Sequence, residues 1–314
     1  MSRSLGQKIS IVVPVYNSED CLLQLNEEIT RAMAGFYWYE LILVNDCSTD
    51  GSWEIIKKIC EVNPCATGIK LRKNSGQDNA ILAGLRAVSG EFAVIMDDDL
   101  QHAPGDIVKL LSKCKDGFDV CYGYFQLKKQ SRWKNLGSWV NGKLAERLLR
   151  KPKGLYLSPF KMIRREVVDE LVRLPGPFPY IDAALLTITS SLSQVEVEHH
   201  SRFKGKGNYG LAKSALVFVR HLTNYSVYPL RLVSVLGFVS SLVAFVLGIF
   251  YLVQYFTDRH RVEGWITLVI LLTFFGGMIL VSLGLIGEYV GRSFIALNGT
   301  PQYVIEKIIT KNNE

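Results

Sequence analysis

The stretch VIMDDDLQHAP, residues Val94 to Pro104, runs from apolar residues directly into three carboxylates. The run Phe92–Met96 predicts a buried strand, because it is short, continuous and apolar. Asp97, Asp98 and Asp99 follow it side by side, and like charges this close raise one another's pKa unless a cation lies among them. We therefore expect a cation site at the end of this strand. A solvated acidic loop is the alternative, but it does not explain why the acids end an apolar strand.

Strand and helix patterns alternate regularly on both sides of this stretch. Apolar strand patterns occur at residues 8–16, 39–46, 67–71, 92–96 and 118–122, and helical spacing occurs at 18–33, 51–62, 76–88 and 104–115. Continuous apolar strands that alternate with helices are typical of a mostly parallel α/β sheet covered by helices on both faces. The fold class we predict is accordingly α/β.

Four polar clusters follow the first four strand patterns. They are PVYNSED at 14–20, NDCSTDGS at 45–52, RKNSGQDN at 72–79 and DDDLQHAP at 97–104. In open parallel sheets, ligands bind beyond the carboxyl ends of the strands, so the clusters predict one binding site. Taken alone, NDCSTDGS could equally be an ordinary helix N-cap. The sequence contains no GxGxxG and no GxxxxGK[ST] motif, which argues against a dinucleotide fingerprint or a P-loop.

The acidic cluster suits a hard divalent cation, Mg²⁺ or Mn²⁺, which prefers oxygen ligands and often bridges to substrate phosphates. Because side chains alternate along an extended segment, we expect Asp97 and Asp99 to face one side and Asp98 to face another. A metal held by two carboxylates and a diphosphate would neutralise the charge of a departing nucleoside diphosphate.

Two uncharged apolar runs, residues 232–256 and 264–287, are each long enough to cross a bilayer as a helix. Two buried core helices are the alternative, but the residues that follow the runs could not supply a surrounding core. Residues 1–8 contain no apolar segment typical of a cleaved signal. All six cysteines lie between Cys21 and Cys121 without metal-site spacing, which favours reduced cytosolic thiols.

Lys and Arg outnumber Asp and Glu by 36 to 29, and the excess lies next to the apolar runs. The basic residues concerned are Arg202, Lys204, Lys206, Lys213, Arg220, Arg231, Arg292, Lys307 and Lys311. The positive-inside rule then predicts a multi-pass protein of the cytoplasmic (inner) membrane, with the catalytic domain and both termini in the cytoplasm. Basic residues near a membrane attract anionic headgroups, so we expect membrane lipids as partners and no nucleic acid.

Several motifs together resemble the family 2 glycosyltransferases of the GT-A fold. They are IVVPVYN (11–17), NDCSTDGS, NSGQDNAILAGL (74–85) and MDDDLQHAP (96–104). RFKGKGNY (202–209), YPLRL (228–232) and GLIGEYVGR (284–292) narrow the resemblance to polyprenyl-phosphate glycosyltransferases similar to bactoprenol glucosyltransferase and dolichol-phosphate mannose synthase. The resemblance implies a GT-A domain over residues 1–210, an interfacial amphipathic helix at 211–230, a transmembrane hairpin at 231–289 and a cytoplasmic tail at 290–314.

The resemblance also implies a function and its residues. A sugar would pass, with inversion, from a nucleotide sugar, which we expect to be a UDP-sugar, to polyprenyl (undecaprenyl) phosphate, and the enzyme would be a homo-oligomer, by resemblance a tetramer. The residues expected to bind donor or acceptor are Pro14, Tyr16, Asn17, Asp46, Asn74, Gln77, Asp98, Arg132, Lys134 and Tyr209. Those expected to bind metal are Asp97, Asp99 and Gln101. Arg202 is expected to hold a phosphate. A surface charge run is an equal alternative for Arg132 and Lys134.

The sequence departs from the family pattern at three places. Cys47 and Gln77 replace the usual glycine and the usual Lys or His, and Pro159 in YLSPFKMI stands where many members carry the Asp that is a candidate base. Asp182 is the nearest substitute. A phosphate monoester acceptor is already largely anionic at pH 7, because its second pKa is about 6. It therefore needs positioning and charge shielding more than deprotonation.

Two other functions remain open. A processive polysaccharide synthase would share the fold, but the segment QSRW at 130–133 is one residue too short for the QxxRW motif of that class and lies too early in the chain. An inactive, membrane-anchored nucleotide-sugar-binding subunit is favoured only by the missing Asp, and the intact acidic motif argues against it.

Overall fold

The computed structural model describes residues 8–35, 38–125, 151–174, 179–198, 228–257, 264–299 and 301–311. The chain forms two compact units. One comprises Met1–Tyr209 together with Thr300–Glu314, and the other comprises Gly210–Gly299. Of the C-terminal tail at 290–314 that the resemblance implies, residues 300–314 therefore belong to the first unit and residues 290–299 to the second.

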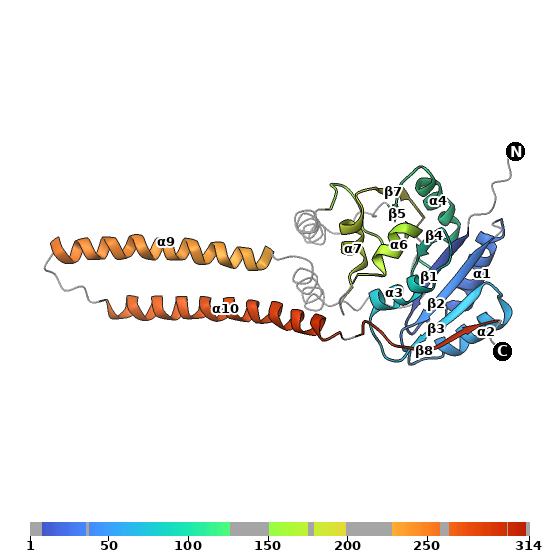
Figure 1. Ribbon diagram of the computed structural model, residues 1–314, viewed down its shortest axis with the longest axis horizontal. Helices are drawn as coiled ribbons and strands as arrows, with labels where there is room; N and C mark the ends of the chain where they lie inside the picture. The colour runs from blue at the N-terminus through green and yellow to red at the C-terminus, as the bar shows by residue number, and fades with distance from the viewer. Residues whose placement is uncertain are drawn as a thin grey trace. The chain divides into compact units, whose positions relative to one another are not determined.

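The first unit is built on a mixed, mostly parallel sheet whose described strands lie in the order β7-β5-β6-β4-β1-β2-β3-β8 (Figure 1). The strands are β1 (Ile9–Val15), β2 (Tyr39–Asn45), β3 (Ala66–Leu71), β4 (Phe92–Ile95), β5 (Val120–Tyr124), β6 (Lys161–Arg164), β7 (Leu192–Glu196) and β8 (Ile305–Thr310). The pairs β1–β2, β1–β4, β2–β3 and β5–β7 are parallel. Strand β6 lies antiparallel between β4 and β5, so the fourth and fifth strands along the chain are not neighbours.

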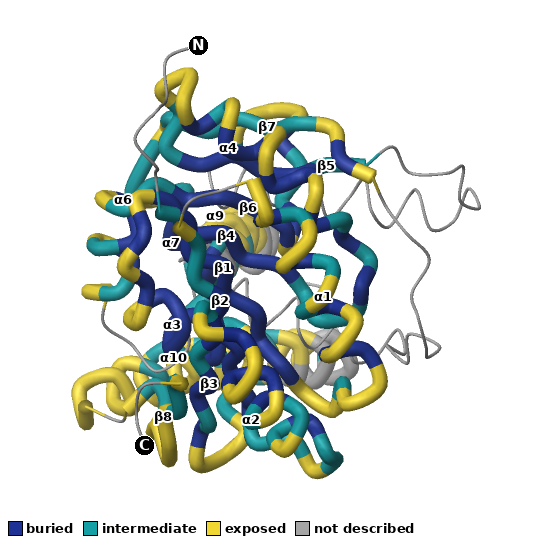
Figure 2. The backbone as a smooth tube through the Cα atoms, turned by 90° about the vertical axis from the view of Figure 1, so that its right-hand side faces the viewer, coloured by how far each residue is buried: buried dark blue, intermediate teal, exposed yellow. Residues whose placement is uncertain are grey.

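Helices cover both faces of the sheet. On one face pack α1 (Leu22–Met33), α2 (Ser52–Val62) and α4 (Ile107–Lys115), the last preceded by a 3-10 turn, η1 (Pro104–Asp106). On the other face pack α3 (Gln77–Ala87), α6 (Arg165–Leu171) and α7 (Ile181–Ile188). Figure 2 shows the central strands buried throughout. Gly84 lets α3 lie close to the sheet, because a Cβ there would collide with the Val12 side chain of β1.

Strand β8 pairs antiparallel with β3 and closes that edge of the described sheet. The Ile309 side chain packs against the core beside Gly68, and Lys70 forms an ion pair with Glu306 at 2.9 Å. The sequence pattern misses this strand because it is short and carries two charges, and because its partner lies far upstream in the chain.

The second unit contains two long helices, α9 (Tyr228–Thr257) and α10 (Trp265–Leu297), which lie side by side (Figure 1). Many of their apolar side chains are exposed, Phe238 by 71% and Leu272 by 73%. Within the described residues, Phe274–Leu297 is long and apolar enough to cross a membrane, whereas the apolar part of α9, Val233–Ile249, is shorter. Of the two predicted spans, only the second meets this test, and the first stays a prediction. The predicted interfacial helix at 211–230 lies almost entirely outside the described residues.

Candidate active site

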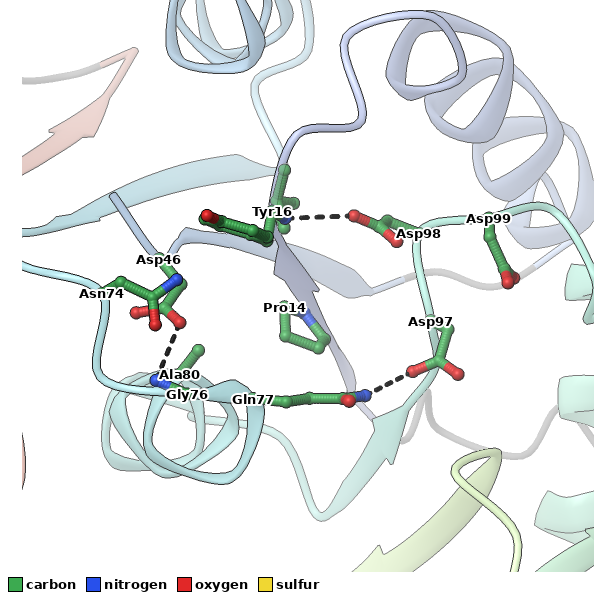
Figure 3. Close-up of a pocket in the computed structure, with 11 residues that line it drawn as sticks. Pro14, Tyr16, Asp46, Asn74, Gly76, Gln77, Ala80, Asp97, Asp98 and Asp99 are labelled. Atoms are coloured by element: carbon green, nitrogen blue, oxygen red, sulfur yellow. Dashed lines mark hydrogen bonds between the residues drawn. The ribbon is translucent and has the colours of Figure 1, made fainter. Parts of the chain in front are cut away.

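A cavity of about 290 Å³ opens at the carboxyl ends of β1, β2 and β4 (Figure 3). Its lining residues are Pro14, Val15, Tyr16, Asp46, Asn74, Gly76, Gln77, Ala80, Asp97, Asp98 and Asp99. Asp46 and Asn74 lie at one end and the three consecutive acids at the other, with Pro14 and Tyr16 between them. The polar clusters predicted to converge therefore do meet at one cavity.

Backbone strain marks the same cavity. Three described non-glycine residues have positive φ, namely Asn17 at 53°, Cys47 at 56° and Leu100 at 60°. Each directly follows a residue that lines the cavity. Left-handed backbone costs about 1–2 kcal/mol for most residues, and such strain gathers at binding sites whose surroundings hold it in place. The three turns thus aim the preceding side chains, and Cys47 occupies a conformation that favours glycine.

The three acids at the end of β4 have different surroundings. Asp97 accepts a hydrogen bond from Gln77 Nε2 at 2.7 Å. Asp98 turns towards the β1–α1 loop, where it accepts hydrogen bonds from the Tyr16 N–H at 3.3 Å and from the Ser18 hydroxyl. Asp99 accepts a hydrogen bond from the backbone N–H of Gln101 at 3.2 Å.

The electrostatics of the acidic end fit a cation. Burial, followed by the charges of Asp99 and Asp98, raises the pKa of Asp97 to about 7. Among the described residues, no three His, Cys, Asp or Glu side chains converge closely enough to form a metal cage. A divalent ion bound here would therefore take part of its coordination from water or from substrate phosphates, as Mg²⁺ usually does.

At the opposite end, Asp46 is fixed by the start of α3. It accepts hydrogen bonds from the N–H groups of Ser75 at 2.7 Å and Gly76 at 2.9 Å. Burial raises the pKa of Asp46, and these two hydrogen bonds oppose that rise. Asn17 Oδ1 instead accepts a hydrogen bond from the Thr49 N–H at 2.8 Å, so this side chain ties two loops together and does not line the cavity.

Asp182, the substitute base considered above, is not among the residues that line the cavity. Its Oδ1 pairs with the Lys161 ammonium and accepts a hydrogen bond from the Tyr122 hydroxyl at 3.2 Å. Lys161, Tyr122 and Asp78 were not predicted from the sequence. A lysine in the apolar segment FKMI was the available signal, because a charge in a buried strand requires a partner.

Four predicted site residues, Arg132, Lys134, Arg202 and Tyr209, lie outside the described residues. Gln101 is described, but its side chain is not among those that line the cavity. The roles assigned to these five residues therefore stay predictions.

Two family models match the chain. The model for glycosyl transferase family 2 matches residues 10–172, and the model for the GtrB C-terminal hairpin matches residues 228–293. The first match contains every residue that lines the cavity, and the second contains most of α9 and α10.

Relatives with named activities match along nearly the whole chain. The undecaprenyl-phosphate 4-deoxy-4-formamido-L-arabinose transferase of Serratia proteamaculans is 30% identical over 309 residues, which cover 96% of this chain and 94% of that protein. The protein of the same name from Yersinia enterocolitica is 31% identical and covers 98% of this chain and 97% of its own length.

Among solved structures, glucosyl-3-phosphoglycerate synthase from Mycobacterium tuberculosis in complex with Mn²⁺ and UDP-glucose matches with a TM-score of 0.53 and 20% identity. The match covers 69% of this chain and 77% of that one. At this identity the likeness establishes the α/β fold of the GT-A type and nothing finer.

Proposed function

Because the chain belongs to glycosyl transferase family 2 and is a glycosyltransferase, we propose that it transfers a sugar from a UDP-sugar to a polyprenyl phosphate. The acceptor would be undecaprenyl phosphate or a similar lipid phosphate, and the configuration at the anomeric carbon would be inverted. The observation that carries the proposal is the cavity with Asp46 at one end and the acids Asp97–Asp99 at the other. Such a cavity suits a nucleoside joined to a diphosphate. The named activity of the full-length relatives supports the lipid phosphate acceptor.

We further propose that Asp97 and Asp99 hold Mg²⁺ or Mn²⁺, with Gln101 as the third ligand. Asp98 accepts hydrogen bonds from Tyr16 and Ser18 and, in this proposal, does not bind the ion. The bound ion would shield the negative charge of the leaving diphosphate. Gln77 would hold Asp97 in position through its hydrogen bond.

The acceptor phosphate would attack without a strong protein base. Asp182 is already paired with the Lys161 ammonium and the Tyr122 phenol, so its carboxylate is engaged by these two partners. The acceptor needs cations to position it, and Arg202, Arg132 and Lys134 stay our candidates because guanidinium groups bind phosphate oxygens in pairs.

For location, we propose that the helix pair α9 and α10 spans the cytoplasmic membrane, with the catalytic unit and both termini in the cytoplasm. Phe274–Leu297 and the match to a C-terminal hairpin support this proposal. A homo-oligomer, in the form of a tetramer, is part of the same proposal and rests on family resemblance alone.

The test uses the purified full-length chain in detergent, undecaprenyl phosphate and a panel of UDP- and GDP-sugars with Mn²⁺. We expect one lipid-linked monosaccharide product, no product in EDTA, and a loss of at least about a hundredfold in Asp99→Asn. Asp98→Asn is the matched control and should be milder, because its carboxylate faces the β1–α1 loop. Chain growth beyond one sugar would favour a processive synthase, and donor binding without turnover would favour an inactive subunit. Full activity in EDTA would exclude the metal assignment.

A further inference from the structure

The start of α7 is held from two sides by polar contacts that the proposed chemistry leaves unused. From the sheet, the Lys161 ammonium pairs with Asp182 Oδ1, and the Tyr122 hydroxyl donates to the same oxygen at 3.2 Å. From α3, Asp78 Oδ1 accepts a hydrogen bond from the Ile181 N–H at 3.4 Å. The position of the Asp182 carboxylate is therefore fixed by contacts from β5, β6 and α3.

This cluster adjoins the acidic end of the cavity. Gln77, the residue before Asp78, lines the cavity and donates a hydrogen bond to Asp97. The Lys161 ammonium lies close enough to lower the pKa of both Asp97 and Asp78, which opposes the burial that raises the pKa of each. Asp46 lies at the other end of the cavity from the three acids.

The donor's geometry indicates what the cluster would meet. We assign the nucleoside to the Asp46 end and the diphosphate to Asp97 and Asp99, and we place the sugar at the acidic end of the cavity, where Gln77 contacts Asp97. This step rests on the proposed function.

Of the ion pair between Lys161 and Asp182, the carboxylate is the more exposed group. The Asp182 side chain is 15% exposed, whereas that of Lys161 is 4% exposed. A group that approaches the pair thus meets a hydrogen-bond acceptor with negative charge. A carboxylate accepts hydrogen bonds from hydroxyl and amide N–H groups and repels another carboxylate. Within the described part of the cluster, Asp78 adds a second carboxylate beside the Lys161 ammonium.

We propose that Asp182, oriented by Lys161 and Tyr122, contacts the transferred sugar and selects a sugar that presents a hydroxyl or amide N–H there over one that presents a carboxylate. Asp182 is in this view a specificity-determining residue, and Lys161 is a positioning residue that acts through it.

The test compares UDP-glucose with UDP-glucuronate, which differ only in a hydroxymethyl group against a carboxylate, and uses UDP alone as reference. Dissociation constants are measured by calorimetry on the full-length chain in detergent with Mn²⁺. We expect the wild type to bind UDP-glucuronate at least about tenfold more weakly than UDP-glucose, the size of one like-charge contact near a protein surface. Asp182→Asn should reduce this ratio to about threefold or less and leave the affinity for UDP within about twofold of the wild type.

Three further variants separate selection from folding. Lys161→Met removes the compensating ammonium and should increase the discrimination against UDP-glucuronate, and Lys161→Arg should restore it. Asp116→Asn makes the same chemical change as Asp182→Asn at an exposed ion pair with Lys113 and should leave the ratio unchanged.

Either of two results overturns the inference while the proposed function stands. One is equal wild-type affinity for the two UDP-sugars, and the other is an Asp182→Asn variant that binds UDP normally and keeps the full discrimination. A wild type that binds none of UDP, UDP-glucose and UDP-glucuronate overturns the proposed UDP-sugar donor, and this inference with it.

Discussion

Replacement of Asp97 by Asn should stabilise the metal-free protein at alkaline pH. Burial and the neighbouring carboxylates raise the pKa of Asp97 from 3.8 to about 7, and the Lys161 charge and the Gln77 hydrogen bond offset this only in part. Because the folded-state pKa lies above the unfolded-state value, the folded chain binds this proton more tightly. The resulting stability is fully present below about pH 4 and is lost as the pH rises through 7.

The pKa shift of Asp97 sets an upper limit on the change in the free energy of unfolding. A rise of about 3 pKa units corresponds to about 4 kcal/mol, and the partial exposure of Asp97 reduces this through solvent screening. We expect Asp97→Asn to raise the free energy of unfolding by about 1–3 kcal/mol at pH 8 in EDTA, and to change it little at pH 4. Denaturant unfolding of the full-length chain in detergent, followed by tryptophan fluorescence at both pH values, measures the difference.

In excess Mn²⁺, the wild type should instead be more stable than Asp97→Asn. The wild type should gain about 2.7 kcal/mol at a hundred times the dissociation constant, and the variant, which lacks one of the two proposed carboxylate ligands, should gain less. The matched control is Asp98→Asn, which weakens hydrogen bonds to Tyr16 and Ser18 and should lose about 1 kcal/mol without such a reversal. An Asp97→Asn variant less stable than the wild type at pH 8 in EDTA would refute this account of the acidic cluster.

Three further predictions address the base, the strained turn and the topology. Asp182→Asn should lower kcat by about tenfold or less, measured as lipid-linked product. In the same assay the wild-type rate should fall near pH 6, because the acceptor phosphate takes its second proton there. A loss of kcat within the 10²–10⁴-fold range of general bases in Asp182→Asn would make Asp182 the base. Because φ is 56° at Cys47, Cys47→Gly should leave the unfolding midpoint unchanged or raise it. Cys47→Val should lower the free energy of unfolding by about 1–2 kcal/mol. Equal stability of the two variants would show that the backbone at this residue is not strained. Thr257→Cys should react with an impermeant thiol reagent added to intact cells, and the parent chain is the control; reaction only after permeabilisation would reverse the topology.

The sequence was sufficient for the parallel half of the sheet. The strands expected between residues 8 and 122 all form, because β1, β2 and β4 are buried on both faces and read as continuous apolar runs. The antiparallel β6 and β8 could not be found in the same way. Each is short and carries charge, and each pairs with a strand distant in the chain, so tertiary packing and not periodicity defines them.

The candidate site shows the same division. The convergence of four polar clusters follows from strand direction alone. Asp98 accepts a hydrogen bond from Ser18 but lines the same cavity as Asp97 and Asp99, so the predicted division of the three side chains stays a prediction. The partner of Lys161 could not be deduced. Asp182 lies on α7, and only the packing of α7 against β5, β6 and α3 brings its carboxylate to Lys161.

Helix α3 contacts both the acidic end of the cavity and the segment that follows α10. Its first residue, Gln77, contacts Asp97 at the acidic end of the cavity. Near its other end, Arg86 donates hydrogen bonds to the Tyr303 hydroxyl and to Gln302 Oε1, both at 3.0 Å, and lies over the Tyr303 ring. These two residues follow shortly after the end of α10 at residue 297. An eleven-residue helix is about 16 Å long, and the close approach at Gly84 holds this one against the sheet. The segment that follows α10 is therefore bound to the helix whose first residue contacts Asp97, a proposed metal ligand, and β8 adds the same segment to the sheet.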